Sequence, residues 1–118
     1  MKIKCNDLFY LGIRKFNIIH AQLRMKCSKL NADLFALHVI DSPACTCGHD
    51  LEDTSHFLLH CPLYIRSRHK MFTKLYNFIN ADDVNMKTLL FGTESYDYEL
   101  NCKISKCVHT FISESGRF

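Results

Sequence analysis

Hydrophobic residues recur along most of this chain at steps of three and four, the period that gathers side chains on one face of an α-helix. The first such run extends from Phe9 to Cys27 and includes Ile13, Phe16, Ile19 or His20, and Leu23. Asn6 or Asp7 precedes the run and is a candidate N-cap. The pattern predicts an amphipathic helix over residues 9–27.

A second, shorter run follows almost directly. It comprises Leu30, Leu34, Leu37 and His38, with Asn31 as a candidate N-cap near its start. The sequence DSP at residues 41–43 ends it, because a proline disfavours helical geometry in the residue before it. We expect a short helix here.

Three further helices are predicted in the second half of the chain. Pro62 suits a first helical turn, and the stripe after it consists of Ile65, His69, Phe72, Leu75 or Tyr76, and Ile79. That helix should end near NADD at residues 80–83. MKTLLF at 86–91, before Gly92, predicts a short helix. A last helix, from about Ser95 to Ile112, carries Leu100, Ile104, Cys107 or Val108, and Phe111 on one face.

No convincing strand alternation interrupts these helical runs. The length of 118 residues suits one domain, and a hydrophobic content of 47% is enough to bury a core. We therefore predict a single all-α domain over residues 1–118, a small bundle of about four or five helices. An irregular segment at residues 43–64, here called the knuckle, interrupts it.

The knuckle, PACTCGHDLEDTSHFLLHCPLY, concentrates three cysteines and three histidines. Four of them, Cys45, Cys47, His56 and Cys61, give the spacing C-x-C-x8-H-x4-C. Thiolate and imidazole are the ligands that Zn²⁺ takes in four-coordinate structural sites. Gly48 suits a tight turn after the first cysteine pair, and Thr54 or Ser55 is expected to cap a short helix carrying His56. The spacing predicts a closed structural zinc site with no position left for substrate.

His60 competes with Cys61 for the fourth position. On an ideal helix His60 lies beside His56, whereas Cys61 points elsewhere. Cys61 can converge if the helix ends or tightens before Pro62, and we prefer it because thiolate is the stronger zinc ligand. His49 lies too close to Cys47 in sequence to complete the site and is expected to be exposed.

Cysteine usage and charge narrow the class of protein further. The chain has seven cysteines, an odd number, and shows neither a secretion signal nor an apolar membrane span. This combination favours free thiols or metal ligands over disulfides. We therefore expect an intracellular protein of the nucleus or cytoplasm. The net charge of +3 is modest, but it gathers in two clusters, one in residues 1–29 and one after the knuckle. Both clusters could face a polyanion.

Three motifs together resemble the carboxy-terminal region of reverse transcriptases from non-LTR retrotransposons of the LINE and jockey-like kind. They are L-R-x5-L-N-x-x-L from Leu23, S-P-x-C-x-C-G from Ser42, and E-D-x-x-H-F-L-x-x-C-P-x-Y from Glu52. The closing FISESGRF is similar to the ends of such polyproteins. The resemblance implies a zinc-binding element downstream of the polymerase, with Cys45, Cys47, His56 and Cys61 as ligands, that helps to hold RNA or target DNA.

This chain departs from the family's pattern at two residues and lacks the signatures of its catalytic domains. Lys26 and Cys27 stand where many relatives have Gly and His, and YDYE at 96–99 is not a polymerase Y-x-D-D signature. Carboxylates spaced for two-metal chemistry are also missing before the knuckle. We therefore expect a non-catalytic piece of a polymerase polyprotein. His20 and His109 lack any recognisable catalytic context and are expected to be core residues.

Two functions remain. The first is a zinc-stabilised module that binds RNA or DNA phosphates with low sequence specificity. Its predicted contacts are Arg14, Lys15, Arg24, Lys26, Lys29, Arg66, Arg68 and Lys70, with Tyr64 and His49 as stacking candidates. The second is a structural module that docks on the preceding polymerase domain through apolar residues such as Phe35.

Overall fold

A computed structural model describes residues 14–118 of the protein. Its α-helices are α2 (Arg14–Arg24), α3 (Asn31–Ala36), α4 (Ile65–Leu75), α5 (Met86–Phe91) and α6 (Tyr98–Ser115). A π-helix (His56–His60) and 3-10 turns at Pro62–Tyr64 and Ala81–Asp83 complete the helical structure. Residues 14–118 contain no strand, so the predicted all-α class is confirmed. None of their helices combines the length and apolar character needed to cross a bilayer.

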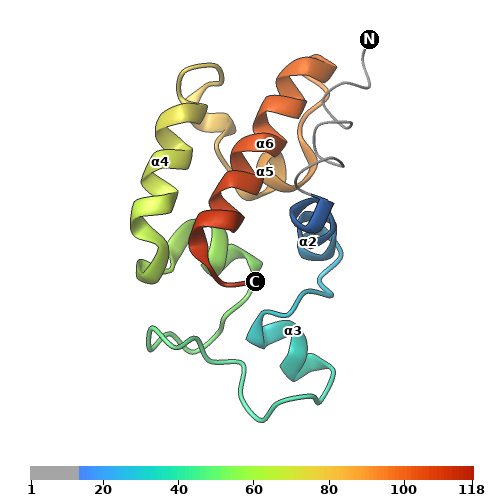
Figure 1. Ribbon diagram of the computed structural model, residues 1–118, viewed down its shortest axis with the longest axis vertical. Coiled ribbons are helices and arrows are strands. Elements are labelled where there is room, and N and C mark those ends of the chain that lie inside the picture. Colours follow the sequence, from blue (N-terminus) through green and yellow to red (C-terminus); the bar gives the residue numbers. More distant parts are fainter. Residues whose placement is uncertain (1–13) are drawn as a thin grey trace.

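The long helix α6 organises the arrangement. It packs along α4 and also contacts α2 and α5. Figure 1 shows α4 and α2 on either side of α6, with α3 and the loop of the knuckle at the far end of the molecule. The carboxyl terminus returns to the region between that end and the helices (Figure 1). This return places the last residues of the chain beside the knuckle.

The core joins the knuckle to the helices. Phe57, from the π-helix, is fully buried, and its ring centroid lies 5.2 Å from that of Phe111 in α6. The rings of Tyr64 and Phe118 approach the same side chain at 5.2 and 5.5 Å. Aromatic side chains bury large apolar areas, so Phe57 anchors the knuckle to the bundle.

A histidine pair occupies the interface of α2, α5 and α6. His20 and His109 are both buried, and His20 Nδ1 lies 3.0 Å from His109 Nε2. His20 Nε2 lies 2.8 Å from the Leu89 carbonyl oxygen. Because a carbonyl can only accept, His20 carries its proton on Nε2 and accepts from His109 on Nδ1. Both residues are core histidines, as expected.

Several element boundaries differ from the predictions. Helix α2 ends at Arg24, which leaves Cys27 exposed instead of on a buried face. Helix α3 ends at Ala36, so Leu37 is 65% exposed. Helix α6 begins at Tyr98, not near Ser95, because the Asp97 side chain accepts from the Leu100 amide. The caps and first turns expected before residue 14 lie outside the described residues.

The short helix after Asn85 was predicted with its observed bounds. Asn85 caps it through a 2.9 Å bond from the Thr88 amide, and Gly92 ends it with a φ of +70°. A side chain at Gly92 would also meet Asn101, whose amide group bonds the Thr93 backbone. The helix propensity of residues 86–91 and the capping residues on either side therefore determine this short helix.

Candidate metal centre

Four side chains of the knuckle converge on one point. The ligand atoms of Cys45, Cys47, His56 and Cys61 all lie within 4.8 Å of one another. The Cys45 and Cys61 sulfurs are 3.7 Å apart, and Cys47 Sγ lies 3.3 Å from His56 Nε2. In a tetrahedral site with Zn–S bonds of about 2.3 Å, neighbouring sulfurs lie about 3.8 Å apart. The arrangement therefore fits a metal ion bound by three thiolates and one imidazole.

A tight turn positions the first two cysteines. The Gly48 amide donates to the Cys45 carbonyl at 3.0 Å, and the Cys45 amide donates to the His49 carbonyl at 2.9 Å. Gly48 has a φ of +103°, in the region that favours glycine, as predicted for this turn. Outside the turn, the Glu52 amide donates to the Pro43 carbonyl at 2.7 Å and closes the loop at its base. The turn thus directs both sulfurs to the same side.

The histidine and the third cysteine come from the π-helix His56–His60 and the residue after it. A π-helix bonds residue i to residue i+5, and the Cys61 amide donates to the His56 carbonyl at 2.7 Å. This wider turn brings Cys61 onto the same face as His56. Cys61 itself is extended, with a ψ of 123°, as expected before Pro62. The helix ends before the proline as predicted, but it widens instead of tightening.

The structure brings Cys61, and not His60, to the other three ligands. The side chain of His60 is exposed. His49 is also exposed, as expected, and its ring stacks on that of His56 with centroids 4.4 Å apart and planes 9° from parallel. His49 thus covers one face of a ligand ring without joining the cluster.

The cap of the ligand-bearing helix is Asp53, not Thr54 or Ser55. Asp53 Oδ1 accepts a hydrogen bond of 2.8 Å from the His56 amide, and the Asp53 carbonyl accepts from the Phe57 amide at 2.9 Å. An aspartate at a helix N-terminus also complements the helix dipole. The helix begins one residue earlier than the prediction implied.

Arg68 in α4 stabilises the end of the π-helix through hydrogen bonds to its backbone. Its guanidinium donates to the carbonyl oxygens of Phe57, Leu58 and Cys61 at 2.9, 2.9 and 2.8 Å. Those carbonyls lie at the carboxyl end of a short helix, where backbone acceptors lack partners within the helix. Arg68 is 7% exposed, so its guanidinium is buried against this backbone and does not face solvent.

Glu52 ties three segments of the chain together. Its carboxylate accepts two hydrogen bonds of 2.9 Å from the Arg117 guanidinium and one of 2.8 Å from the Asn31 amide. Arg117 also donates to the Lys29 carbonyl at 3.0 Å, and Asn31 Nδ2 donates to the Ala44 carbonyl at 2.7 Å. Asn31 therefore holds the loop through its side chain and does not act as the predicted N-cap.

The surroundings of the candidate ligands shift their pKa values in different directions. A hydrogen bond from the His49 backbone lowers the pKa of Cys47, whereas burial raises the pKa of Cys61 to about 12. Burial and the neighbouring charge of His49 lower the pKa of His56, which favours the neutral imidazole that binds metals. A cation in the cluster would compensate the Cys61 thiolate that burial alone disfavours.

The residues predicted to contact nucleic acid fall into three groups. Six are exposed, namely Arg14, Lys15, Lys26, Lys29, Arg66 and Lys70. Arg24 is half-buried and donates to the Leu90 carbonyl at 3.1 Å, and Arg68 is the buried residue described above. Arg14 and Lys15 lie on α2, whereas Arg66 and Lys70 lie on α4, and these helices flank α6 (Figure 1). The exposed basic residues of α2 and α4 therefore lie on different sides of the bundle.

The two stacking candidates also differ in their surroundings. Tyr64 packs against Phe57, while His49 is exposed.

Sequence reasoning missed the supporting roles of Glu52, Arg68 and Arg117. A signal was present for two of them, because Glu52 opens the third motif and Arg117 lies in the closing FISESGRF. Asn31, which also bonds Glu52, lies in the first motif. Motif residues without an evident chemical role thus form one hydrogen-bonded network.

Comparison with known proteins adds no family assignment. No family model matches the chain, and neither curated proteins nor solved structures give a significant match.

Proposed function

We propose that this protein is a zinc-stabilised nucleic-acid-binding module, the non-catalytic tail of a retrotransposon reverse transcriptase. The observation that carries the proposal is the convergence of three thiols and one imidazole from a seventeen-residue span, Cys45 to Cys61. Soft sulfur ligands in a tetrahedral set are typical of zinc. The retrotransposon origin rests on the sequence resemblance alone, that is, on the three motifs and the closing FISESGRF.

The role of the zinc in this proposal is structural. Four protein ligands complete the tetrahedral coordination, so water and substrate have no position on the metal. Cys45, His56 and Cys61 are buried and Cys47 is partly buried. The ion would fix the loop of the knuckle, whose apolar side chains are few, against α3 and α4.

Elemental analysis of the purified protein tests the zinc. We expect about one zinc per chain, a loss of most of it in Cys61→Ser, and full retention in His60→Ala. His60 is the matched control because it is the neighbouring residue with metal-binding chemistry and is exposed. Zinc retained in Cys61→Ser but lost in His60→Ala would contradict the ligand set.

The nucleic-acid part of the proposal is supported by exposed basic side chains, and residues 14–29, which hold those of the first cluster, include no acidic residue. The contacts proposed are Arg14, Lys15, Lys26, Lys29, Arg66 and Lys70. Phosphate contacts release counterions, so binding should weaken steeply with salt and vary little with sequence. Fluorescence anisotropy with labelled single-stranded RNA, single-stranded DNA and duplex DNA, each over a salt series, measures this. Weak binding at low salt with no salt dependence would contradict it.

A second candidate function is docking on the preceding polymerase domain. Two observations favour it. The exposed basic residues of α2 and α4 lie on different sides of the bundle instead of sharing one face, and Phe35, Leu37 and Val39 are exposed at the end of α3. Neighbouring exposed apolar residues of this kind mark interaction surfaces. Substituting Leu37 and Val39 with Ser should then weaken co-purification with the polymerase domain while leaving nucleic-acid affinity unchanged.

A further inference from the structure

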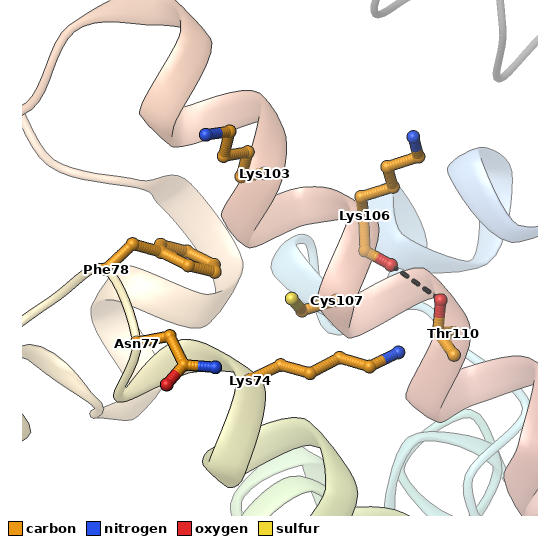
Figure 2. A pocket seen from close by; sticks show the side chains of 7 residues that line it. All are labelled: Lys74, Asn77, Phe78, Lys103, Lys106, Cys107 and Thr110. Atoms are coloured by element: carbon orange, nitrogen blue, oxygen red, sulfur yellow. Dashed lines mark hydrogen bonds between the residues drawn. The ribbon is translucent and has the colours of Figure 1, made fainter.

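A basic cleft lies between the end of α4 and the middle of α6, away from the metal centre. Lys74 and Phe78 line it from the α4 side, and Lys103, Lys106 and Cys107 line it from α6. Its volume is about 340 Å³, within the range of about 300–1,000 Å³ of small-ligand pockets. Figure 2 shows Lys74 extending from α4 toward α6 and the Cys107 sulfur pointing into the space between Lys74 and Phe78.

The charge of this cleft is of one sign, since no carboxylate lines it. Lys103 Nζ lies 6.0 Å from the centroid of the Phe78 ring. Burial raises the pKa of Cys107, and the charges of Lys74 and Lys106 oppose that rise, so both ammonium groups act on the interior of the cleft. All three lysines are exposed enough to meet a ligand. An anion is the complementary occupant.

The cleft continues a basic ridge along α4. Arg66, Lys70 and Lys74 follow one another at four-residue steps, so they share one face of the helix. Arg66 and Lys70 are exposed and belong to the proposed nucleic-acid contacts. The ridge leads from the knuckle end of α4 to the cleft at its other end, a track suited to a linear polyanion.

Two features favour a nucleotide over an acidic peptide. Lysine binds phosphate as a point charge, and the cleft contains no arginine to hold a planar carboxylate by paired bonds. The Phe78 ring is only partly buried at the cleft, and aromatic side chains are the groups on which the bases of single strands stack. Stacking of this kind requires a base that is not paired within a duplex.

We propose that the α4–α6 cleft binds a phosphate of single-stranded nucleic acid between Lys74, Lys103 and Lys106, with an adjacent base on Phe78. The strand then follows Lys70 and Arg66 toward the knuckle. This inference rests on the proposed function and specifies the strand type and the site.

The test uses the zinc-loaded protein with a labelled single-stranded thymidine oligonucleotide. In amide-resolved NMR, addition of the oligonucleotide should shift the Asn77, Phe78, Cys107 and Thr110 signals, which report on the cleft. Lys74→Gln, Lys103→Gln and Lys106→Gln should each lower the slope of log affinity against log salt by about 0.7. The matched control is Lys87→Gln, an exposed lysine on α5 outside the cleft, which should leave the slope unchanged.

A stacking variant separates single strands from duplexes. Phe78→Leu should weaken oligonucleotide binding roughly fivefold or more and leave duplex binding unchanged. Circular dichroism verifies that this variant is folded. If this variant unfolds, the exposed lysine variants still decide whether the strand occupies the cleft.

The possible results separate this inference from the proposed function. Oligonucleotide binding that shifts other amides and responds equally to Lys74→Gln and Lys87→Gln overturns the cleft and leaves the proposed function standing. No binding of any nucleic acid at low salt overturns both. Displacement of the oligonucleotide by an equally charged polyglutamate peptide at the same concentration would overturn the choice of phosphate and make the cleft a protein-binding site.

Discussion

The guanidinium of Arg68 donates a hydrogen bond of 2.8 Å to the carbonyl oxygen of Cys61, the last residue of the metal-ligand cluster. Through its bonds to Phe57 and Leu58, the same side chain satisfies the end of the π-helix. The position of one member of the cluster is therefore coupled to α4, and a residue with no candidate ligand atom of its own shapes the site. This coupling explains how a wide helical turn, unfavourable by itself, persists at this point.

Removing Arg68 should therefore weaken both the fold and metal binding. In Arg68→Met the Phe57 and Leu58 carbonyl oxygens lose their bonds from the guanidinium, and the Cys61 carbonyl keeps only the 3.3 Å bond from the Tyr64 amide. We expect the free energy of unfolding to fall by about 3 kcal/mol or more. Urea titration of the zinc-loaded protein measures this, and competition with a chromophoric chelator measures the zinc affinity. Arg66→Met is the control, since Arg66 is exposed on the same helix and should change little.

Zinc removal should disorder the knuckle more than the helices. Without a cation the buried Cys61 stays protonated, and the four ligand groups no longer hold the loop together. We expect the melting temperature to fall by about 10 °C or more on chelation, while most of the far-ultraviolet signal of α4 and α6 persists. Re-addition of zinc should restore the transition. An unchanged melting temperature after complete removal of zinc would contradict a structural role.

The contact between Glu52 and Arg117 should couple the last residues of the chain to the knuckle. Both carboxylate oxygens accept from one guanidinium, and the Glu52 side chain is 4% exposed. Glu52→Gln and Arg117→Met should each destabilise the protein, and a double-mutant cycle should give a coupling of about 1–3 kcal/mol. A coupling near zero would show that the pair does not join the two segments.

The helices could be predicted from the sequence because their hydrophobic period and their caps are local. Met86–Phe91 had its observed bounds, and the four converging ligands followed from spacing and from the effect of Pro62. The supporting network could not be predicted in the same way. Arg68 follows Arg66 on an amphipathic helix and has the sequence pattern of a solvated charge, yet it points inward and bonds three carbonyl oxygens at the end of the π-helix. Its role depends on contacts between segments, which no local pattern contains.

The histidine pair sets a pH dependence that is separate from the metal. Burial lowers the pKa of His20 to about 4 and that of His109 to about 3, and the charge of Arg24 contributes to both shifts. An unfolded histidine titrates near pH 6.5, so below that pH the unfolded chain binds protons that the folded chain does not. Stability is therefore fully present above pH 6.5 and falls as the pH is lowered toward 4, by up to about 1.4 kcal/mol per pH unit for each histidine.

Urea titrations at a series of pH values between 7 and about 4 measure this fall. His109→Gln should flatten the slope, because it removes one buried imidazole while its amide can still donate to His20 Nδ1. Zinc content is measured at each pH in both proteins, since release of zinc from His56 also lowers stability in acid but does so equally in the variant. Equal pH slopes in the two proteins at equal zinc content would show that the pair is not the source.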